Sequence, residues 1–360
     1  MDIHALKRKC IAALSAAMLA SSLSYAALPA PSAAAGSNIL GAVLGGGVAA
    51  IQLNNEIKTY NNTEKGRQAL FEGLKEKYGV NDDEELNQRL DTIMNNLTEA
   101  IASVDPSIRE KPYNYFINKE KGFNAFCTLG HNLSVNTGLF SVLTNEDEIA
   151  VVLGHEMGHG QKDHPAKGAR QSLVPAILAS AAGNNIGAVI LANAINNQGI
   201  TKPMEREADA LAFEYITHSN YNPGACAAVW QRVIDKSGNN PDTFATFLAG
   251  GSDHPSNASR RDTYAKKLHE YSKGHVTVEK GAVMVNGKHF ATPASAEGMS
   301  GAERSYFVAG NLAAAYRNGH DKDDVHVKGN VVMLGAQDIM EAASGDEDAH
   351  VLSQRLASIK

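Results

Sequence analysis

The sequence predicts an α+β fold: a mostly helical domain that holds a short sheet, followed by a small C-terminal module of duplicated β-β-α units. Three observations lead to this prediction. Apolar residues recur every three to four positions over 63–104, which is typical of amphipathic helices. Two short extended runs follow at 113–118 and 133–136. Residues 275–360 then repeat one pattern of strands and a helix.

Residues 1–26 have the pattern of a secretory signal peptide. Basic residues at 7–9 precede an apolar run at 11–23, and residues 24–26 include the small side chains that a cleavage site needs. The alternative is an uncleaved membrane anchor, for which the apolar run is short. The sequence therefore predicts an exported protein, located in the periplasm, elsewhere in the cell envelope, or secreted.

Residues 27–62 are expected to form an Ala- and Gly-rich linker or an apolar segment, in which the apolar part at 39–53 is too short to span a bilayer. Peripheral association with a membrane is one interpretation of this segment. The net charge of −6, without a basic patch, argues against nucleic-acid binding. Cys127 and Cys226 follow the signal peptide, and the sequence leaves open whether they are bridged or free.

Two amphipathic helices are expected at the start of a domain over 63–272. The first begins near Thr63, and the second covers about 83–104. One face of the second helix carries its apolar residues, which are Leu86, Leu90, Ile93, Leu97 and Ile101. Such a face predicts packing against the rest of the domain.

The pattern HExxH occurs at 155–159, inside a helical run that starts near residue 145. His155 and His159 are four residues apart, so on a helix they share one face. Two imidazoles so placed can hold one Zn²⁺, and Glu156 leans toward the open metal position, where it can take a proton from bound water. The alternative is a pair of histidines that only satisfy hydrogen bonds in a buried helix. Acidic residues at 146–148 suit the start of the helix.

A zinc enzyme needs a third protein ligand, and the best candidate is Glu205 in the helical run 204–213. Asp209 lies one turn later on the same face and can accept the outward N–H of a ligating histidine, which fixes its tautomer. Glu207 points elsewhere on this helix and is expected to be a solvated or salt-bridged charge. His164 is expected to support the site, with direct ligation as the alternative. The other interpretation of the three acids is a solvated helix face.

His254 lies in the loop 252–255, downstream of the third ligand. It is a candidate for a fourth metal ligand in a resting state, or for a hydrogen bond to the oxyanion. An ordinary loop histidine is the alternative.

Several motifs taken together resemble one protein family. They are HEMGH at 155–159, EREAD at 205–209, Asn124-Ala125-Phe126, and His254-Pro255 with Arg260 beyond it. This set is similar to the zinc metallopeptidase family of HtpX and the CAAX prenyl endopeptidases, the forty-eighth metallopeptidase family, of the gluzincin type. The resemblance covers roughly residues 64–270. It implies a zincin-like fold over 63–272 and one Zn²⁺ per chain, held by His155, His159 and Glu205, with Asp209 supporting a ligand.

The expected function is that of an exported zinc-dependent metalloendopeptidase that hydrolyses peptide bonds in protein or peptide substrates. Kinship suggests quality control of misfolded envelope proteins. The apolar stretch 173–195 is interrupted at Asn184-Asn185, and neither half can span a membrane, so a helical hairpin over the site is predicted. This argues against an integral-membrane prenyl protease. The remaining rival is an envelope chaperone or scaffold that binds partners through the zincin fold and the C-terminal repeats.

Zincins bind substrates along an edge strand beside the metal, and the run Asn132–Asn136 is the candidate, with an ordinary core strand as the alternative. In the C-terminal module over 275–360, the run 276–287 matches 325–335 with one residue fewer. Capping boxes are predicted where each helix starts, at Ser300 and Ser344. The module has no metal or nucleophile pattern, so a docking or substrate-selecting role is expected, or a structural cap. The oligomeric state is not predicted.

Overall fold

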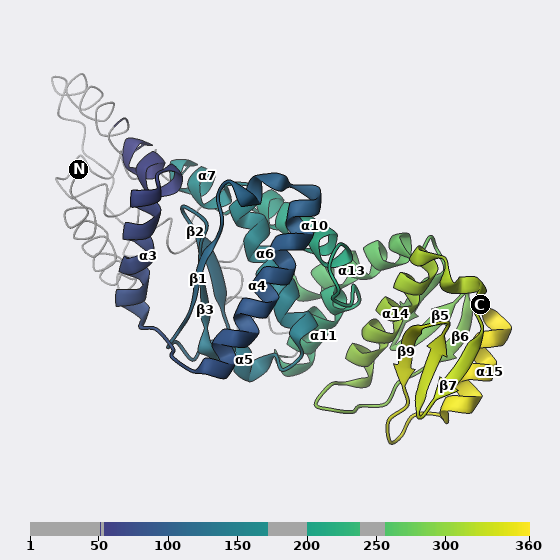
Figure 1. Cartoon of the computed structure of the whole chain (residues 1–360). Coiled ribbons are helices and arrows are strands. Elements are labelled where there is room, and N and C mark those ends of the chain that lie inside the picture. Colours follow the sequence, from purple (N-terminus) through teal and green to yellow (C-terminus); the bar gives the residue numbers. More distant parts are fainter. Residues whose placement is uncertain (1–50, 52–53, 172–199, 238–255) are drawn as a thin grey trace, which may run out of the picture. The chain divides into compact units, whose positions relative to one another are not determined.

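The computed structural model describes residues 51, 54–171, 200–237 and 256–360 (Figure 1). The predicted signal peptide, the predicted hairpin at 173–195 and His254 lie outside these residues, as does most of the 27–62 segment, of which residues 54–62 are helical. The α+β class is confirmed, because the described chain is mostly helical and contains small sheets of three strands each.

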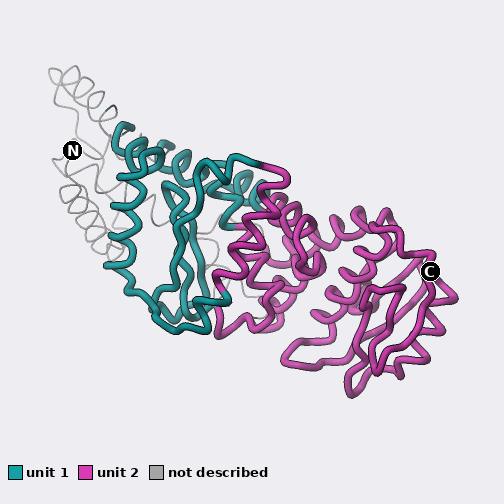
Figure 2. Tube along the Cα trace, viewed as in Figure 1, with its two compact units in different colours: residues 1–89, 106–139, 156–208 teal, residues 90–105, 140–155, 209–360 magenta. Residues whose placement is uncertain are grey.

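Contacts between Cα atoms divide the chain into two compact units (Figure 2). Unit 1 comprises residues 1–89, 106–139 and 156–208. Unit 2 comprises residues 90–105, 140–155 and 209–360. Helices α6 (Glu146–Gln161) and α10 (Lys202–Thr217) are each continuous through a unit boundary.

The sheet of unit 1 has the strand order β1-β3-β2. Its strands are β1 (Asn114–Asn118), β2 (Ala125–Thr128) and β3 (Asn132–Asn136). β3 pairs in parallel with β1 and in antiparallel with β2, and all of its residues are buried. The expectation that Asn132–Asn136 is an edge strand is therefore wrong, because this strand is paired on both sides. β2 lies at an edge of the sheet instead.

Helix α3 (Glu64–Tyr78) packs on β1 and β3, with Leu70 and Leu74 completely buried. It begins where the sequence predicts, since the Thr63 side chain accepts a hydrogen bond from the Gly66 N–H. Helix α7 (His164–Gln171) packs on β2.

Helix α4 (Glu84–Val104) confirms the second predicted amphipathic helix, and Leu90, Ile93, Leu97 and Ile101 are buried as expected. A 3₁₀ turn (Pro106–Arg109) follows it. The remaining helices before the C-terminal module are α5 (Thr137–Val142), α11 (Ala225–Ser237) and α13 (Asn257–Tyr271). Within unit 2, α11 packs on α13, and both pack on the first helix of the C-terminal module.

The C-terminal module contains two β-β-β-α halves, so the prediction of two strands in each half is wrong. The first half is β4 (Val276–Glu279), β5 (Ala282–Val285), β6 (Lys288–Ala291) and α14 (Gly301–Asn318). A 3₁₀ turn (His320–Lys322) leads to the second half, which is β7 (Val325–Lys328), β8 (Val331–Leu334), β9 (Gln337–Glu341) and α15 (Ala349–Ile359). In the first half, the third strand follows a two-residue hairpin turn in which Asn286 and Gly287 both adopt positive φ, at 52° and 73°.

The two halves share one spacing, so the expected difference of one residue is wrong. Val276 pairs with Val285 and Val325 pairs with Leu334, and a bulge follows Val283 in one half and Val332 in the other. Helix α14 packs on β4, β5 and also β9, whereas α15 packs on β7, β8 and also β6. Each half therefore supplies a helix that also packs on the last strand of the other half.

Side chains at equivalent positions of the two helices also bind the last strand of the other half. Asn311 of α14 donates to the Ile339 carbonyl of β9 at 3.1 Å, and Arg355 of α15 donates to the Phe290 carbonyl of β6 at 2.7 Å. These bonds satisfy backbone oxygens on strands that lie at sheet edges.

At the first predicted capping box, Ser300 caps α14 by accepting from the Glu303 N–H at 3.1 Å. The second is wrong: α15 is capped by Asp348, which accepts from His350 N–H. Glu347 binds Arg355 at 2.6 Å instead of returning to Ser344.

Candidate metal centre

The first turn of α6 is fixed by Asn145, whose side chain accepts from the Asp147 N–H at 2.8 Å. From there the helix carries His155 and His159 one turn apart, and both side chains are buried. A backbone that forms an ordinary helix is sufficient to place the two imidazoles on one face.

Three side chains come together around α6. His155, His159 and Glu205 each offer one ligand atom, and these atoms all lie within 4.8 Å of one another. The Nε2 atom of His159 is 3.2 Å from Glu205 Oε1. Two imidazole nitrogens and one carboxylate oxygen are a ligand set that zinc uses in catalytic sites.

The outward nitrogen of His155 is held by an acid on α10. Its Nδ1 lies 3.0 Å from Asp209 Oδ1. Asp209 in turn accepts from Arg260 of α13 and, at 3.0 Å, from the hydroxyl of Tyr264. Burial would raise the pKa of Asp209, but the Arg260 guanidinium and His155 lower it to about 2. An ionised Asp209 accepts the Nδ1 proton and leaves Nε2 of His155 for a metal.

The outward nitrogen of His159 is held by a second histidine, His164. Their Nδ1 atoms lie 3.0 Å apart, and Nε2 of His164 lies 3.2 Å from Glu207 Oε2. Burial, together with the neighbouring His159, lowers the pKa of His164 to about 4, so its ring is neutral at pH 7. A neutral ring that donates Nε2–H to Glu207 has an acceptor at Nδ1, which receives the His159 proton and leaves His159 Nε2 for a metal.

The side chain of Glu156, which follows His155, is held in place by the sheet of unit 1. Glu156 is buried, and its Oε2 accepts from the Cys127 backbone N–H of β2 at 2.9 Å. The edge strand β2, rather than β3, therefore lies beside this carboxyl.

Cys127 and Cys226 are both free and buried, which answers the question of their pairing left open by the sequence.

Further residues support the site through contacts that the sequence does not indicate. Arg260 packs its guanidinium over the Trp230 ring at 3.7 Å from the ring centroid, and it also donates to Asp209. At the end of α6, Tyr113 donates to the Met157 carbonyl at 2.6 Å, and His131 Nε2 lies 3.1 Å from the Gly160 carbonyl. Arg260 and Tyr264 are four residues apart on α13, and this helical spacing places both side chains on the face that meets Asp209.

Replacing Asp209 by Asn is expected to weaken zinc binding by about 10–100-fold, because an amide accepts the His155 proton less strongly and no longer balances Arg260. Competition with a chromogenic chelator measures this. The matched control is Glu214→Gln, which removes one charge from the exposed face of the same helix and should leave zinc affinity unchanged. Equal affinities in both variants would contradict a supporting role for Asp209.

Comparison with known proteins gives one family and several relatives. The model of peptidase family M48 matches residues 84–267. The chain is similar to the beta-barrel assembly-enhancing protease of Yersinia pestis, at 29% identity over 42% of this chain and 33% of the relative. It is also similar to the metalloprotease LoiP of Escherichia coli, at 27% identity over 49% of this chain and 68% of the relative.

A mitochondrial relative matches the same region. The metalloendopeptidase OMA1 of Schizosaccharomyces pombe is 30% identical over 38% of this chain and 41% of its own length. For two of these three relatives, the matched part is less than half of the relative's own length. Within the part of the chain that is described, none of the helices is long and apolar enough to cross a membrane.

Proposed function

The chain belongs to peptidase family M48, and from this premise we propose that it is an exported zinc-dependent metalloendopeptidase that acts in protein quality control of the cell envelope. The observation that carries the proposal is the convergence of His155, His159 and Glu205, with the outward nitrogen of each imidazole already engaged by another side chain. Such an arrangement presents the remaining nitrogens to a metal.

In the proposed site, His155, His159 and Glu205 would hold the ion. A zinc ion held there would act as a Lewis acid toward the scissile carbonyl and would lower the pKa of the attacking water. The Glu156 carboxylate takes a proton from this water and delivers it to the leaving amine. The Cys127 N–H donates to one Glu156 oxygen and so orients the carboxylate. Asp209 and His164 keep the ligating rings in one tautomer.

The substrates are proposed to be proteins of the envelope, including misfolded ones. The basic and apolar pattern of residues 1–26 supports export. One relative is named as a protease that enhances beta-barrel assembly, which supports a role in protein assembly or its quality control. His254, outside the described residues, remains the candidate for a fourth ligand or an oxyanion partner.

A second proposal is an envelope chaperone or scaffold that uses the same fold for binding alone. The buried, positioned Glu156 disfavours it, because binding without hydrolysis needs no proton acceptor beside the metal.

Removal of the metal distinguishes the protease from the chaperone or scaffold. We expect the purified protein to contain one zinc per chain and to cleave casein, to lose cleavage after dialysis against a chelator, and to regain it on addition of zinc. Zinc content by atomic absorption and casein cleavage by gel measure this. A zinc-loaded protein that binds casein and leaves it intact would support the chaperone.

A further inference from the structure

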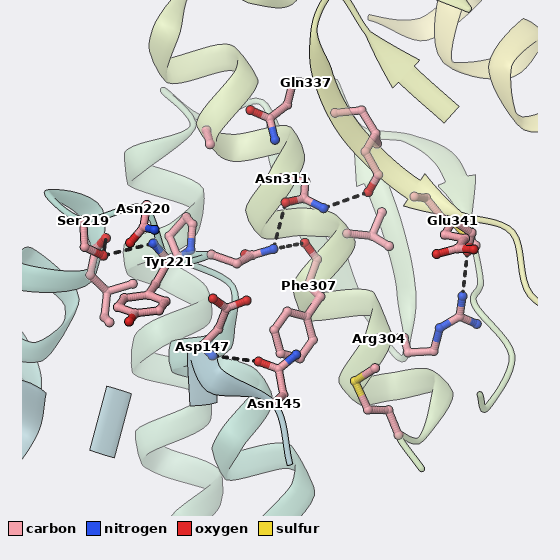
Figure 3. A pocket seen from close by; sticks show the side chains of 18 of the residues that line it. Asn145, Asp147, Ser219, Asn220, Tyr221, Arg304, Phe307, Asn311, Gln337 and Glu341 are labelled. Atoms are coloured by element: carbon pink, nitrogen blue, oxygen red, sulfur yellow. Dashed lines mark hydrogen bonds between the residues drawn. The ribbon is translucent and has the colours of Figure 1, made fainter. Parts of the chain in front are cut away.

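A pocket with a volume of 730 Å³ lies within unit 2, and none of the candidate zinc ligands lines it. It is bounded by the first turn of α6, the turn after α10, helix α14 and strand β9 (Figure 3). Figure 3 shows Ser219, Asn220 and Tyr221 on one side and Arg304 with Glu341 on the opposite side. The volume falls in the range of about 300–1,000 Å³ that ligand sites have.

The charges that line this pocket are unbalanced. Three carboxylates belong to the lining, from Asp147, Glu297 and Glu341. Burial raises the pKa of Asp147 to about 6, so this carboxyl is still ionised at neutral pH. Arg304 is the cation among the lining residues, and its charge is matched by Asp346 at 2.8 Å. The pocket therefore presents a negative potential, which favours cationic groups and repels anions.

The wall of the pocket is fixed before any ligand arrives. The Asn222 amide donates to the Phe307 carbonyl at 3.0 Å and to Asn311 Oδ1 at 2.8 Å. Asn311 then donates to the Ile339 carbonyl, so the turn after α10, helix α14 and strand β9 are joined by one chain of hydrogen bonds. Further amides line the space at Asn220, Asn318 and Gln337. Amide groups both donate and accept, as peptide groups do.

Helix α14, which lines the pocket, is also anchored to α6 by a buried charge cluster. Arg232 of α11 binds Glu148 of α6 at 3.0 Å and also binds Glu303 of α14. All three side chains are buried. Burial and the neighbouring Glu148 raise the pKa of Glu303 to about 8, and burial also raises the pKa of Glu148. The pocket is thus attached to the helix that carries His155 through buried contacts.

We propose that this pocket binds an extended, lysine- or arginine-bearing segment of the protein substrate, apart from the segment that is cleaved. The inference rests on the proposed protease function. The negative lining selects the basic side chains, the amides match the peptide backbone, and Phe307 and Ile339 offer apolar contact. Asp147 and His155 are eight residues apart on α6, an axial rise of about 12 Å. A bound segment therefore lies at least about four extended residues from the scissile bond.

The test measures peptide binding with zinc-loaded Glu156→Gln protein, so that cleavage does not interfere. The probe is a fluorescein-labelled ten-residue peptide of Gly and Ser with three lysines, and a counterpart carries glutamates instead. The pocket variant adds Glu297→Lys and Glu341→Lys. The matched control adds Glu279→Lys and Asp338→Lys, which lie on exposed positions of the same module outside the pocket and change the net charge equally.

We expect the lysine peptide to bind the pocket variant about ten-fold more weakly than the parent, and the control less than about two-fold more weakly. The glutamate peptide should bind the parent poorly. Equal weakening of lysine-peptide binding in both variants would show nonspecific attraction and overturn the proposal. The proposal would also be overturned if the parent bound a neutral N-acetylglucosamine oligomer more tightly than the lysine peptide. Casein cleavage by the parent protein is a separate readout: if it is absent while pocket-dependent peptide binding persists, the protease function fails and the pocket assignment stands.

Discussion

Replacing Glu156 by Gln is expected to lower kcat for casein by about 10²–10⁴-fold while the protein keeps its zinc. The carboxylate is the proton acceptor of the proposed reaction, and an amide cannot take a proton from water at neutral pH. The side-chain oxygen of Gln can still accept from the Cys127 N–H, so β2 and α6 should remain in place. Casein cleavage, zinc content and the unfolding midpoint, measured on one preparation, separate chemistry from folding.

The pattern of these three measurements decides the role of Glu156. Lost cleavage with unchanged zinc and stability supports a base. Lost zinc would instead indicate that Glu156 holds the metal or its ligands. Cleavage at the parent rate would show that another group moves the proton, and the proposed mechanism would have to be abandoned.

The parts of the site that lie on one helix could be predicted from the sequence. His155 and His159 share a face of α6, and Glu205 and Asp209 share a face of α10, because helical periodicity alone fixes those relations. The sequence also named Asp209 and His164 as supporting residues, but not which ring each of them meets. That pairing, like the contact of the Glu156 carboxyl with β2, depends on how separate elements pack.

The difference between local pattern and packing also explains which predictions of the fold are wrong. The strand Asn132–Asn136 was recognised as a strand, but its central place depends on β1 and β2, and no local pattern records strand order. The third strand of the first C-terminal half is a different case, since Asn286-Gly287 is a strong hairpin signal that the sequence itself contains. The capping box at Ser344 failed because Arg355 competes for Glu347.

Loss of a residue that supports a metal ligand weakens metal binding by at most about 100-fold. Replacing the ligand Glu205 by Gln is expected to weaken zinc binding by more than this, and to abolish cleavage at low zinc concentration. The amide is uncharged, so it neither offsets the charge of the ion nor matches a carboxylate as a ligand. Chelator competition measures the affinity, and circular dichroism checks that the fold is retained.

Neighbouring acids on α10 provide the controls that make this result specific. Glu207→Gln, two residues away, changes a half-exposed carboxyl that touches only His164 among the residues of the site, and it should cost less affinity than Asp209→Asn. The expected order of loss is therefore Glu205, Asp209, Glu207. Should Glu205→Gln retain zinc as tightly as Glu207→Gln, the third ligand must come from elsewhere in the chain, since a site of two imidazoles lacks the third protein ligand that catalytic zinc sites have.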